Sequence, residues 1–201
     1  PAGVAAPAYA AGEAHVFTRV GSVWTRSQVL RALSPATAAR FGFALALNGD
    51  SAVIGAPGAS AGAGRAYHFE RQLGVFGLRS EWTPIDAQPD DAFGWSVALR
   101  DDRLLVAAPF AGLALDACGR IEQYQREGGF FASRGPLRLP NASPDGLFGW
   151  SLALGATGEF ASTPATIGRA GLGHFFNASE SVFDDAFDIV LGPCFAPEPA
   201  P

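Results

Sequence analysis

The residues best suited to catalysis in this sequence are three pairs of adjacent aspartates, Asp90-Asp91, Asp101-Asp102 and Asp184-Asp185. Two carboxyl groups are what general acid and base chemistry on a glycosidic bond requires. Neighbouring residues of a strand point to opposite faces, however, and aspartates at strand ends and turns usually interact with solvent and with the turn backbone. We therefore expect these pairs to be structural and predict that the protein is not an enzyme.

The three histidines are dispersed along the chain, and none is placed as a metal ligand. His15, His68 and His174 lack neighbouring cysteines and a matched acidic cluster. The sequence also lacks the Gly-x-Ser-x-Gly motif of many hydrolases, a phosphate-binding glycine loop and the His-Glu-x-x-His motif of metalloproteases. We expect surface or strand-face histidines and predict neither a metal site nor a cofactor.

Two cysteines, Cys118 and Cys194, are the remaining reactive side chains. Their number fits one disulfide in an oxidising compartment and also fits two buried thiols; we favour the disulfide because other features point to the outside of the cell. We therefore expect an extracellular, cell-surface or periplasmic protein. All 14 basic residues are Arg, and Ala, Gly and Pro are abundant, which indicates a GC-rich, bacterial gene.

Composition indicates a globular protein and excludes two classes of partner. The chain is 48% hydrophobic and 16% charged, which is enough apolar material for a core. Its net charge is -5 and its basic residues are spread from Arg19 to Arg169, so we expect no nucleic-acid partner. The most apolar stretch, Leu104 to Leu115, is interrupted by Pro109 and Gly112 and is shorter than the roughly 20 residues of a membrane-spanning helix, so we expect no membrane insertion.

The dipeptide Phe-Gly marks an internal repeat. It occurs at residues 41–42, 93–94 and 148–149, in steps of 52 and 55 residues. Further landmarks keep the same steps, namely Phe17, Phe69, Tyr124 and Phe176; Trp24, Phe76, Phe131 and Phe183; and Leu30, Trp82, Leu137 and Ile189. Four related units with a period near 50 residues are typical of a β-propeller.

Each unit has the pattern of four strands. After the first Phe-Gly, bulky and small residues alternate with a period of two, which predicts a strand with Phe41, Phe43, Leu45 and Leu47 on one face and Gly42, Ala44 and Ala46 on the other. The turn Asn48-Gly49 leads to further strands at 51–56, 65–71 and 77–85. We expect the bulky face of one sheet to pack against the small face of its neighbour.

The predicted fold is therefore all-β, a propeller of about four antiparallel, four-stranded blades of 52–55 residues. The units are 1–40, 41–92, 93–147 and 148–192, followed by a Pro/Ala-rich tail or linker at 193–201. The first unit starts at its second strand, so one inner strand is missing. The chain is either a closed four-blade domain or part of a larger propeller, and we favour the larger propeller.

The Phe-Gly strand followed by Gly55-Ala56-Pro57 resembles the FG-GAP repeat of integrin α-subunit propellers and many secreted bacterial proteins. Relaxed copies of the second motif stand at 107–109 and 162–164, and Ala5-Ala6-Pro7 belongs to the incomplete first unit. The resemblance implies an adhesion or binding module. It also implies calcium loops in many members, but the corresponding turns at 48–50, 100–103 and 155–158 are too short and too poor in carboxylates to hold the ion.

Topology places the loops between strands two and three, and those between consecutive blades, at one end of the propeller. This end is the usual ligand face of the resembled family. It gathers five charged residues that we predict to bind a ligand: Asp90, Asp91, Asp116, Arg120 and Asp145. It also gathers both cysteines, so a Cys118–Cys194 disulfide is geometrically permitted.

Three functions are compatible with this arrangement. We expect a non-catalytic extracellular binding or adhesion module with a protein or glycan ligand, by analogy with the resembled family. A second hypothesis is a structural subunit of a surface assembly, in which another chain or further blades complete the open inner-strand position. A third is the non-catalytic part of a polysaccharide-active enzyme.

Overall fold

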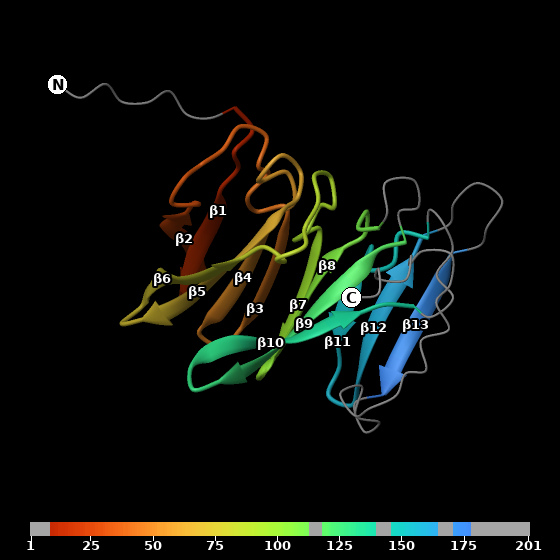
Figure 1. Ribbon diagram of the computed structural model, residues 1–201. Coiled ribbons are helices and arrows are strands. Elements are labelled where there is room, and N and C mark those ends of the chain that lie inside the picture. The colour runs from red at the N-terminus through yellow and green to blue at the C-terminus, as the bar shows by residue number, and fades with distance from the viewer. Residues whose placement is uncertain (1–8, 113–117, 140–145, 165–170, 178–201) are drawn as a thin grey trace.

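The computed structural model describes residues 9–112, 118–139, 146–164 and 171–177, and these residues form thirteen β-strands and no helix. They build four antiparallel sheets that follow one another in chain order as an open row (Figure 1). The predicted all-β class is thereby confirmed. None of the described residues forms a helix long and apolar enough to cross a membrane.

Each sheet is a meander of strands that are consecutive in the chain. The first sheet holds β1 (Ala14–Val20) and β2 (Val23–Leu30); the second holds β3 (Ala44–Asn48), β4 (Ser51–Ala56), β5 (Arg65–Gln72) and β6 (Val75–Trp82). The third holds β7 (Ser96–Arg100), β8 (Arg103–Ala108), β9 (Arg120–Glu127) and β10 (Phe130–Leu137), and the fourth holds β11 (Leu152–Leu154), β12 (Gly158–Thr163) and β13 (Leu172–Asn177).

These sheets fall within the four predicted repeat units. The exact boundaries of the units stay a prediction. Residues 1–8 and 178–201 lie outside the described residues, and with them the motif Ala5-Ala6-Pro7 and the predicted tail at 193–201.

The Phe-Gly dipeptide lies before the innermost strand instead of inside it, which corrects the predicted alternation. β3 begins at Ala44, and Gly42 has a φ of +91°, a left-handed conformation that ends the regular pleat. Phe41 is consequently buried, while Phe43, Leu45 and Leu47 are exposed. Phe41 therefore does not share the environment of the three residues predicted to lie on its face.

Neighbouring sheets pack as the alternation of bulky and small residues predicts. Ala44, Ala46 and Val53 of the second sheet contact the core of the third, which contains Val97 and Leu104. Between the third and fourth sheets the corresponding core joins small and medium-sized residues of one sheet to Phe148 and Leu152 of the next. A hydrophobic layer between each pair of sheets therefore stabilises the row.

Main-chain contacts fix the position of each sheet relative to the next. The amide of Phe93 donates a hydrogen bond to the carbonyl oxygen of Ala63, with a nitrogen to oxygen distance of 3.0 Å. Equivalent bonds join Phe41 to Ala11 at 2.7 Å and Phe148 to Cys118 at 3.1 Å. The segment before the third strand of one sheet is thus bound to the Phe-Gly turn of the following sheet.

Candidate binding surface

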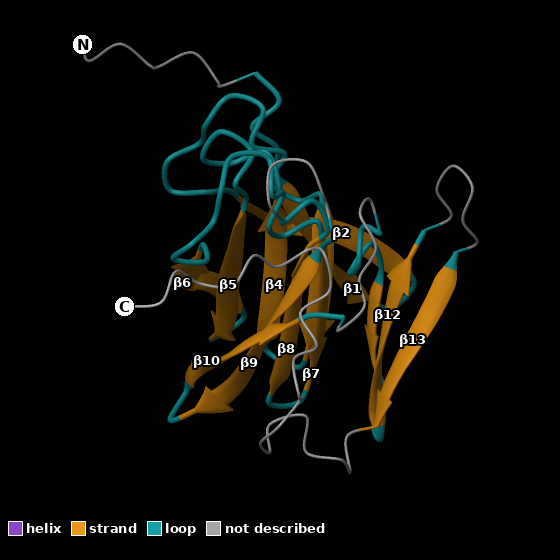
Figure 2. Ribbon diagram, turned by 45° about the vertical axis from the view of Figure 1, so that its right-hand side comes forward, coloured by secondary structure: helices purple, strands orange, loops and turns teal. Residues whose placement is uncertain are grey.

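The loops gather at one end of the sheets, as the topology predicts (Figure 2). The loop after β4 and the linker between β6 and β7 run side by side there, because the amide of Ala92 donates a hydrogen bond of 2.8 Å to the carbonyl oxygen of Gly62. The first loop connects strands two and three of one sheet, and the linker connects two sheets. This end, called the loop end from here on, is the place where residues from different sheets meet.

A row of aromatic side chains crosses the sheets beside the Phe-Gly turns. Phe43, Trp95 and Trp150 directly follow Phe-Gly in three consecutive sheets. The ring centroid of Trp95 lies 4.7 Å from that of Phe43 and 4.7 Å from that of Trp150. Phe110, in the loop after β8, lies 5.2 Å from Trp95 and 6.1 Å from Trp150. These four residues form one contiguous aromatic row.

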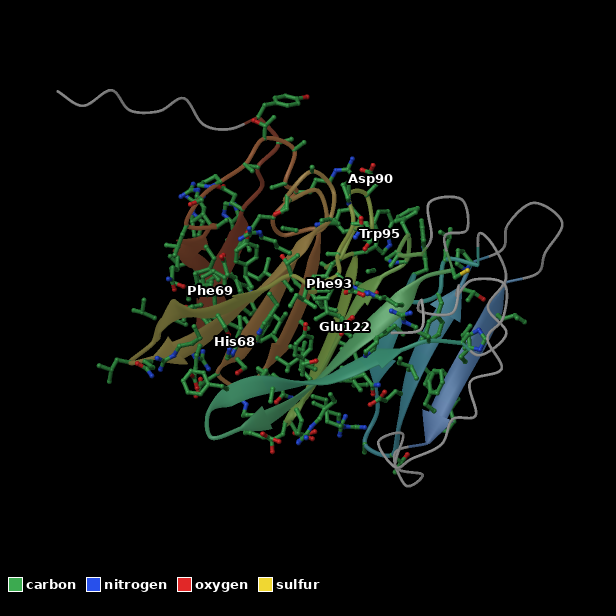
Figure 3. All side chains as sticks on the ribbon, viewed as in Figure 1. His68, Phe69, Asp90, Phe93, Trp95 and Glu122 are labelled. Carbon is green, nitrogen blue, oxygen red and sulfur yellow. The ribbon has the colours of Figure 1, made fainter. Side chains whose placement is uncertain are left out.

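The aromatic row is partly open to solvent. Phe43 is 46% exposed and Trp150 is 37% exposed, although both rings contact Trp95. Figure 3 shows Trp95 at the same end of the molecule as Asp90, which lies on the linker before β7. Solvent-accessible aromatic rings held by their neighbours offer contact area to a ligand at a small cost in side-chain entropy.

Of the five residues predicted to bind a ligand, Asp90 is exposed at the loop end. It has a φ of +68° and lies against Gly62, so the linker and the loop after β4 are in contact at this point. Asp116 and Asp145 lie outside the described residues.

Asp91 and Arg120 are buried in contacts that hold the linker. A carboxylate oxygen of Asp91 accepts a hydrogen bond of 2.9 Å from the main-chain amide of Gln88, and burial raises the pKa of this carboxyl. The Arg120 guanidinium donates to Asp86 at 2.7 Å and lies 3.3 Å from the Glu122 carboxylate. Any role of Asp91 or Arg120 in ligand binding stays a prediction, and their observed contacts are within the protein.

Arg120 lies beside two carboxylates, Asp86 and Glu122, whose pKa values are shifted in opposite directions. The hydrogen bond from Arg120 lowers the pKa of Asp86, which remains exposed. Glu122 is buried, and burial raises its pKa although the Arg120 charge opposes the shift. Arg120 thus joins the linker on one sheet to strand β9 of the next, which is a structural function.

His68 belongs to the core between sheets and cannot act on an external ligand. Its ring is 1% exposed, lies 3.1 Å from the Ser51 hydroxyl, and contacts Trp82 and Phe131 at centroid distances of 6.0 Å and 5.1 Å. Burial lowers its pKa to about 4, and the Arg126 charge adds to the shift. Although a Ser–His pair can serve nucleophilic catalysis, here both side chains are inaccessible.

Neither cysteine can be assigned to the surface. Cys118 is buried at the segment that enters β9, and Cys194 lies outside the described residues, so their pairing stays a prediction. Within the described ranges, no group of three or more His, Cys, Asp or Glu side chains is arranged to hold a metal ion.

The alternating pattern predicted Phe43, Trp95 and Trp150 as strand residues, and the contact of the Trp95 ring with the other two rings was not predicted. The signal was present, because an aromatic residue follows Phe-Gly in each of the three copies. A second missed feature is the glycine that stands 29 residues before each Phe-Gly, at positions 12, 64 and 119. Each has a positive φ and lies against the following Phe.

Comparison with known proteins agrees with this architecture. A family model for the FG-GAP repeat matches residues 24–69 and 77–118. The first match runs from β2 of the first sheet into β5 of the second, and the second match runs from β6 through β7 and β8 of the third sheet to Cys118. No curated protein matches the chain.

Proposed function

The chain is an FG-GAP repeat protein whose sheets are β-propeller blades, and from this premise we propose that it is a non-catalytic extracellular module that binds a protein or glycan through its loop end. The observation that carries the proposal is the aromatic row of Phe43, Trp95, Phe110 and Trp150. Proteins of this repeat family are generally non-catalytic and are often binding modules. The aromatic row supports a ligand site at the loop end.

The chemistry of the loop end suits a ligand with both apolar and polar groups. The aromatic rings supply flat apolar area, and the exposed carboxylate of Asp90 supplies a hydrogen-bond acceptor at the same end of the molecule as Trp95. Binding sites commonly combine an apolar aromatic centre with a small number of polar groups at the rim. A sugar ring with one apolar face and a protein segment with an apolar anchor both match this combination.

The extracellular location rests on the repeat family and on the cysteines. FG-GAP repeats typify extracellular or surface proteins. We place the protein outside the bacterial cytoplasm and pair Cys118 with Cys194, since disulfides persist in oxidising compartments. The buried position of Cys118 suits a structural disulfide more than a reactive thiol.

A ligand screen with matched tryptophan variants tests the proposal. The labelled chain is applied to an array of bacterial and host polysaccharides and extracellular-matrix proteins, and each ligand found is titrated against the double variant Trp95→Ala/Trp150→Ala. The control is Trp24→Ala, which removes an exposed tryptophan from β2, away from the loop end.

We expect the double variant to bind at least tenfold more weakly and the Trp24→Ala variant to bind like the unmodified chain. Circular dichroism and thermal unfolding establish that the double variant is folded. A ligand that binds both variants equally, or an array on which the unmodified chain binds nothing, would refute a ligand site at the aromatic row.

A further inference from the structure

The first sheet contains the third and fourth strands of a blade. β1 aligns with β5 and β9 in the repeat, since Phe17, Phe69 and Tyr124 are equivalent landmarks. β5 pairs with strands on both of its edges, and so does β9, whereas among the described residues β1 pairs with β2 alone. The other edge of β1 corresponds to the edge that receives the second strand in the complete blades.

The face of the second sheet beside this edge is apolar and exposed. Leu45 and Leu47 of β3 are 60% and 67% exposed. Val97, the repeat equivalent of Leu45 in the third sheet, is 9% exposed. Because both positions carry apolar residues and only one is covered, the difference arises from what packs against them.

The complete interfaces show what covers this position. In the third sheet, Val97 and Leu99 are covered by Ala44 and Ala46 of β3, together with Val53 of β4. In the fourth sheet, Leu152 and Leu154 are packed against a cluster that contains Ala98, Leu105 and Ala107 of β7 and β8. In both cases the cover comes from the first two strands of the preceding sheet, with small residues on the innermost strand.

The outer part of this face of the second sheet is already covered by the first sheet. Ala14, Leu30 and Ala32 of the first sheet and the segment after it pack in one cluster with Phe41 and Phe69 of the second sheet. The exposed leucines therefore continue an existing interface. The uncovered part of this face is as wide as two strands. A complete four-stranded sheet from a second copy of the chain would therefore overlap β1 and β2.

From these observations we infer that Leu45, Leu47 and the open edge of β1 form an acceptor surface for a β-hairpin with the character of the first two strands of an FG-GAP blade. The hairpin presents small residues to the two leucines, and its second strand pairs antiparallel with β1, as β4 pairs with β5 and β8 with β9. Main-chain hydrogen bonds to a strand edge and burial of apolar side chains would together hold it. The inference rests on the blade architecture and does not depend on the proposed ligand site at the loop end.

A peptide taken from the sequence of this chain can test the inference. A labelled peptide with the sequence of residues 93–109 contains β7 and β8 and therefore the small residues that cover Leu152 and Leu154. Fluorescence anisotropy measures its binding to the full chain. The matched control peptide carries Ala98→Arg, which places a long charged side chain on the face that must contact the leucines.

We expect saturable binding with one peptide per chain, at least tenfold weaker binding of the Ala98→Arg peptide, and a similar loss when the chain carries Leu45→Glu/Leu47→Glu. The control chain carries Leu73→Glu, a fully exposed leucine at the β5–β6 turn, and should bind the peptide unchanged. Should the glutamate variant fail to fold, Leu45→Ala/Leu47→Ala removes most of the apolar contact without adding charge.

Hydrogen exchange provides a second measurement, because pairing with the peptide should protect main-chain amides of β1 and leave those of β13 unchanged. Equal binding of the two peptides, or equal binding by the leucine variants and the Leu73→Glu control, would overturn the inference. So would self-association of the chain that the peptide does not displace, since that result would assign the surface to a second copy. Retained peptide binding in Trp95→Ala/Trp150→Ala would show that the acceptor surface is separate from the loop-end site.

Discussion

Gly64 and Phe93 contact each other through their main chains at the boundary between the second and third blades. A Cβ atom on Gly64 would overlap the carbonyl oxygen of Phe93, and the φ of Gly64 is +87°. The same contact recurs between Gly12 and Phe41. The glycine therefore permits the close approach through which one blade sets the position of the next.

The variant Gly64→Ala should lower the free energy of unfolding by about 3 kcal/mol, because the methyl group meets both a steric overlap and an unfavourable φ. The control is Gly74→Ala, at a φ of +85° with no neighbouring atom within 4 Å, which should cost only about 1 kcal/mol. Chemical denaturation measures both values. Equal losses in the two variants would show that the contact with Phe93 has no energetic weight.

Much of the blade architecture could be predicted because it is encoded locally. The second strand of the second blade was predicted at residues 51–56, where β4 lies, since the Asn48-Gly49 turn fixes its start. The start of β3 could not be predicted from alternation, because the Phe-Gly pattern continues without a visible break into the strand. Gly42 has a positive φ and lies against the main chain of Glu13 in the preceding blade, and the alternation of residues reveals neither feature.

The candidate site was less predictable, because burial depends on contacts between distant residues. Asp91 stands on the linker before β7 and Arg120 at the start of β9, and the sequence does not show that both side chains are buried. Arg120 donates its hydrogen bond to Asp86, which lies 34 residues before it in the chain, and such a contact between distant residues is not visible in the sequence. The contact between Trp95 and Trp150 likewise depends on how two blades pack, and spacing in the sequence alone does not give the distance.

His68 should make stability depend on pH. Its pKa is about 4 in the folded protein and about 6.5 in the unfolded chain, so the unfolded state takes up a proton first as the pH falls. The His68 contribution is complete above pH 6.5 and is lost between pH 6.5 and pH 4, by a total of about 3 kcal/mol.

The variant His68→Gln copies Gln123, the residue at the same repeat position in the next blade, and removes this titration. Its free energy of unfolding should fall less between pH 7 and pH 4.5 than that of the unmodified chain, measured by denaturation at constant ionic strength. Parallel pH curves for the two proteins would contradict the assignment of a buried, neutral His68.

The proposed disulfide between Cys118 and Cys194 predicts a redox-dependent stability. Cross-linking two residues this far apart in the chain reduces the conformational entropy of the unfolded state, which corresponds to about 4 kcal/mol. We expect the denatured chain to react with iodoacetamide only after reduction and the reduced protein to unfold at lower temperature. Cys118→Ser should unfold like the reduced protein, and alkylation of both cysteines without reductant would refute the pairing.

Arg120 should be more important for stability than an ordinary surface arginine, because it is buried beside the carboxylate of Glu122. The variant Arg120→Leu leaves this carboxylate without its cation, and we expect a loss of about 3 kcal/mol at pH 7. Protonation of the stranded carboxyl relieves the cost, so the difference from the unmodified chain should shrink as the pH is lowered from 7 to 5.

The double variant Arg120→Leu/Glu122→Leu removes both buried charges and should recover part of the lost stability, since an uncompensated charge costs more than an apolar pair of similar size. Arg79→Leu is the matched control, because that arginine pairs with Glu70 at 3.0 Å on a more exposed part of the sheet. Its loss should stay below about 1 kcal/mol. A double variant no more stable than Arg120→Leu would mean that the cost lies in lost packing and in the Asp86 hydrogen bond, and that Arg120 does not act chiefly by neutralising Glu122.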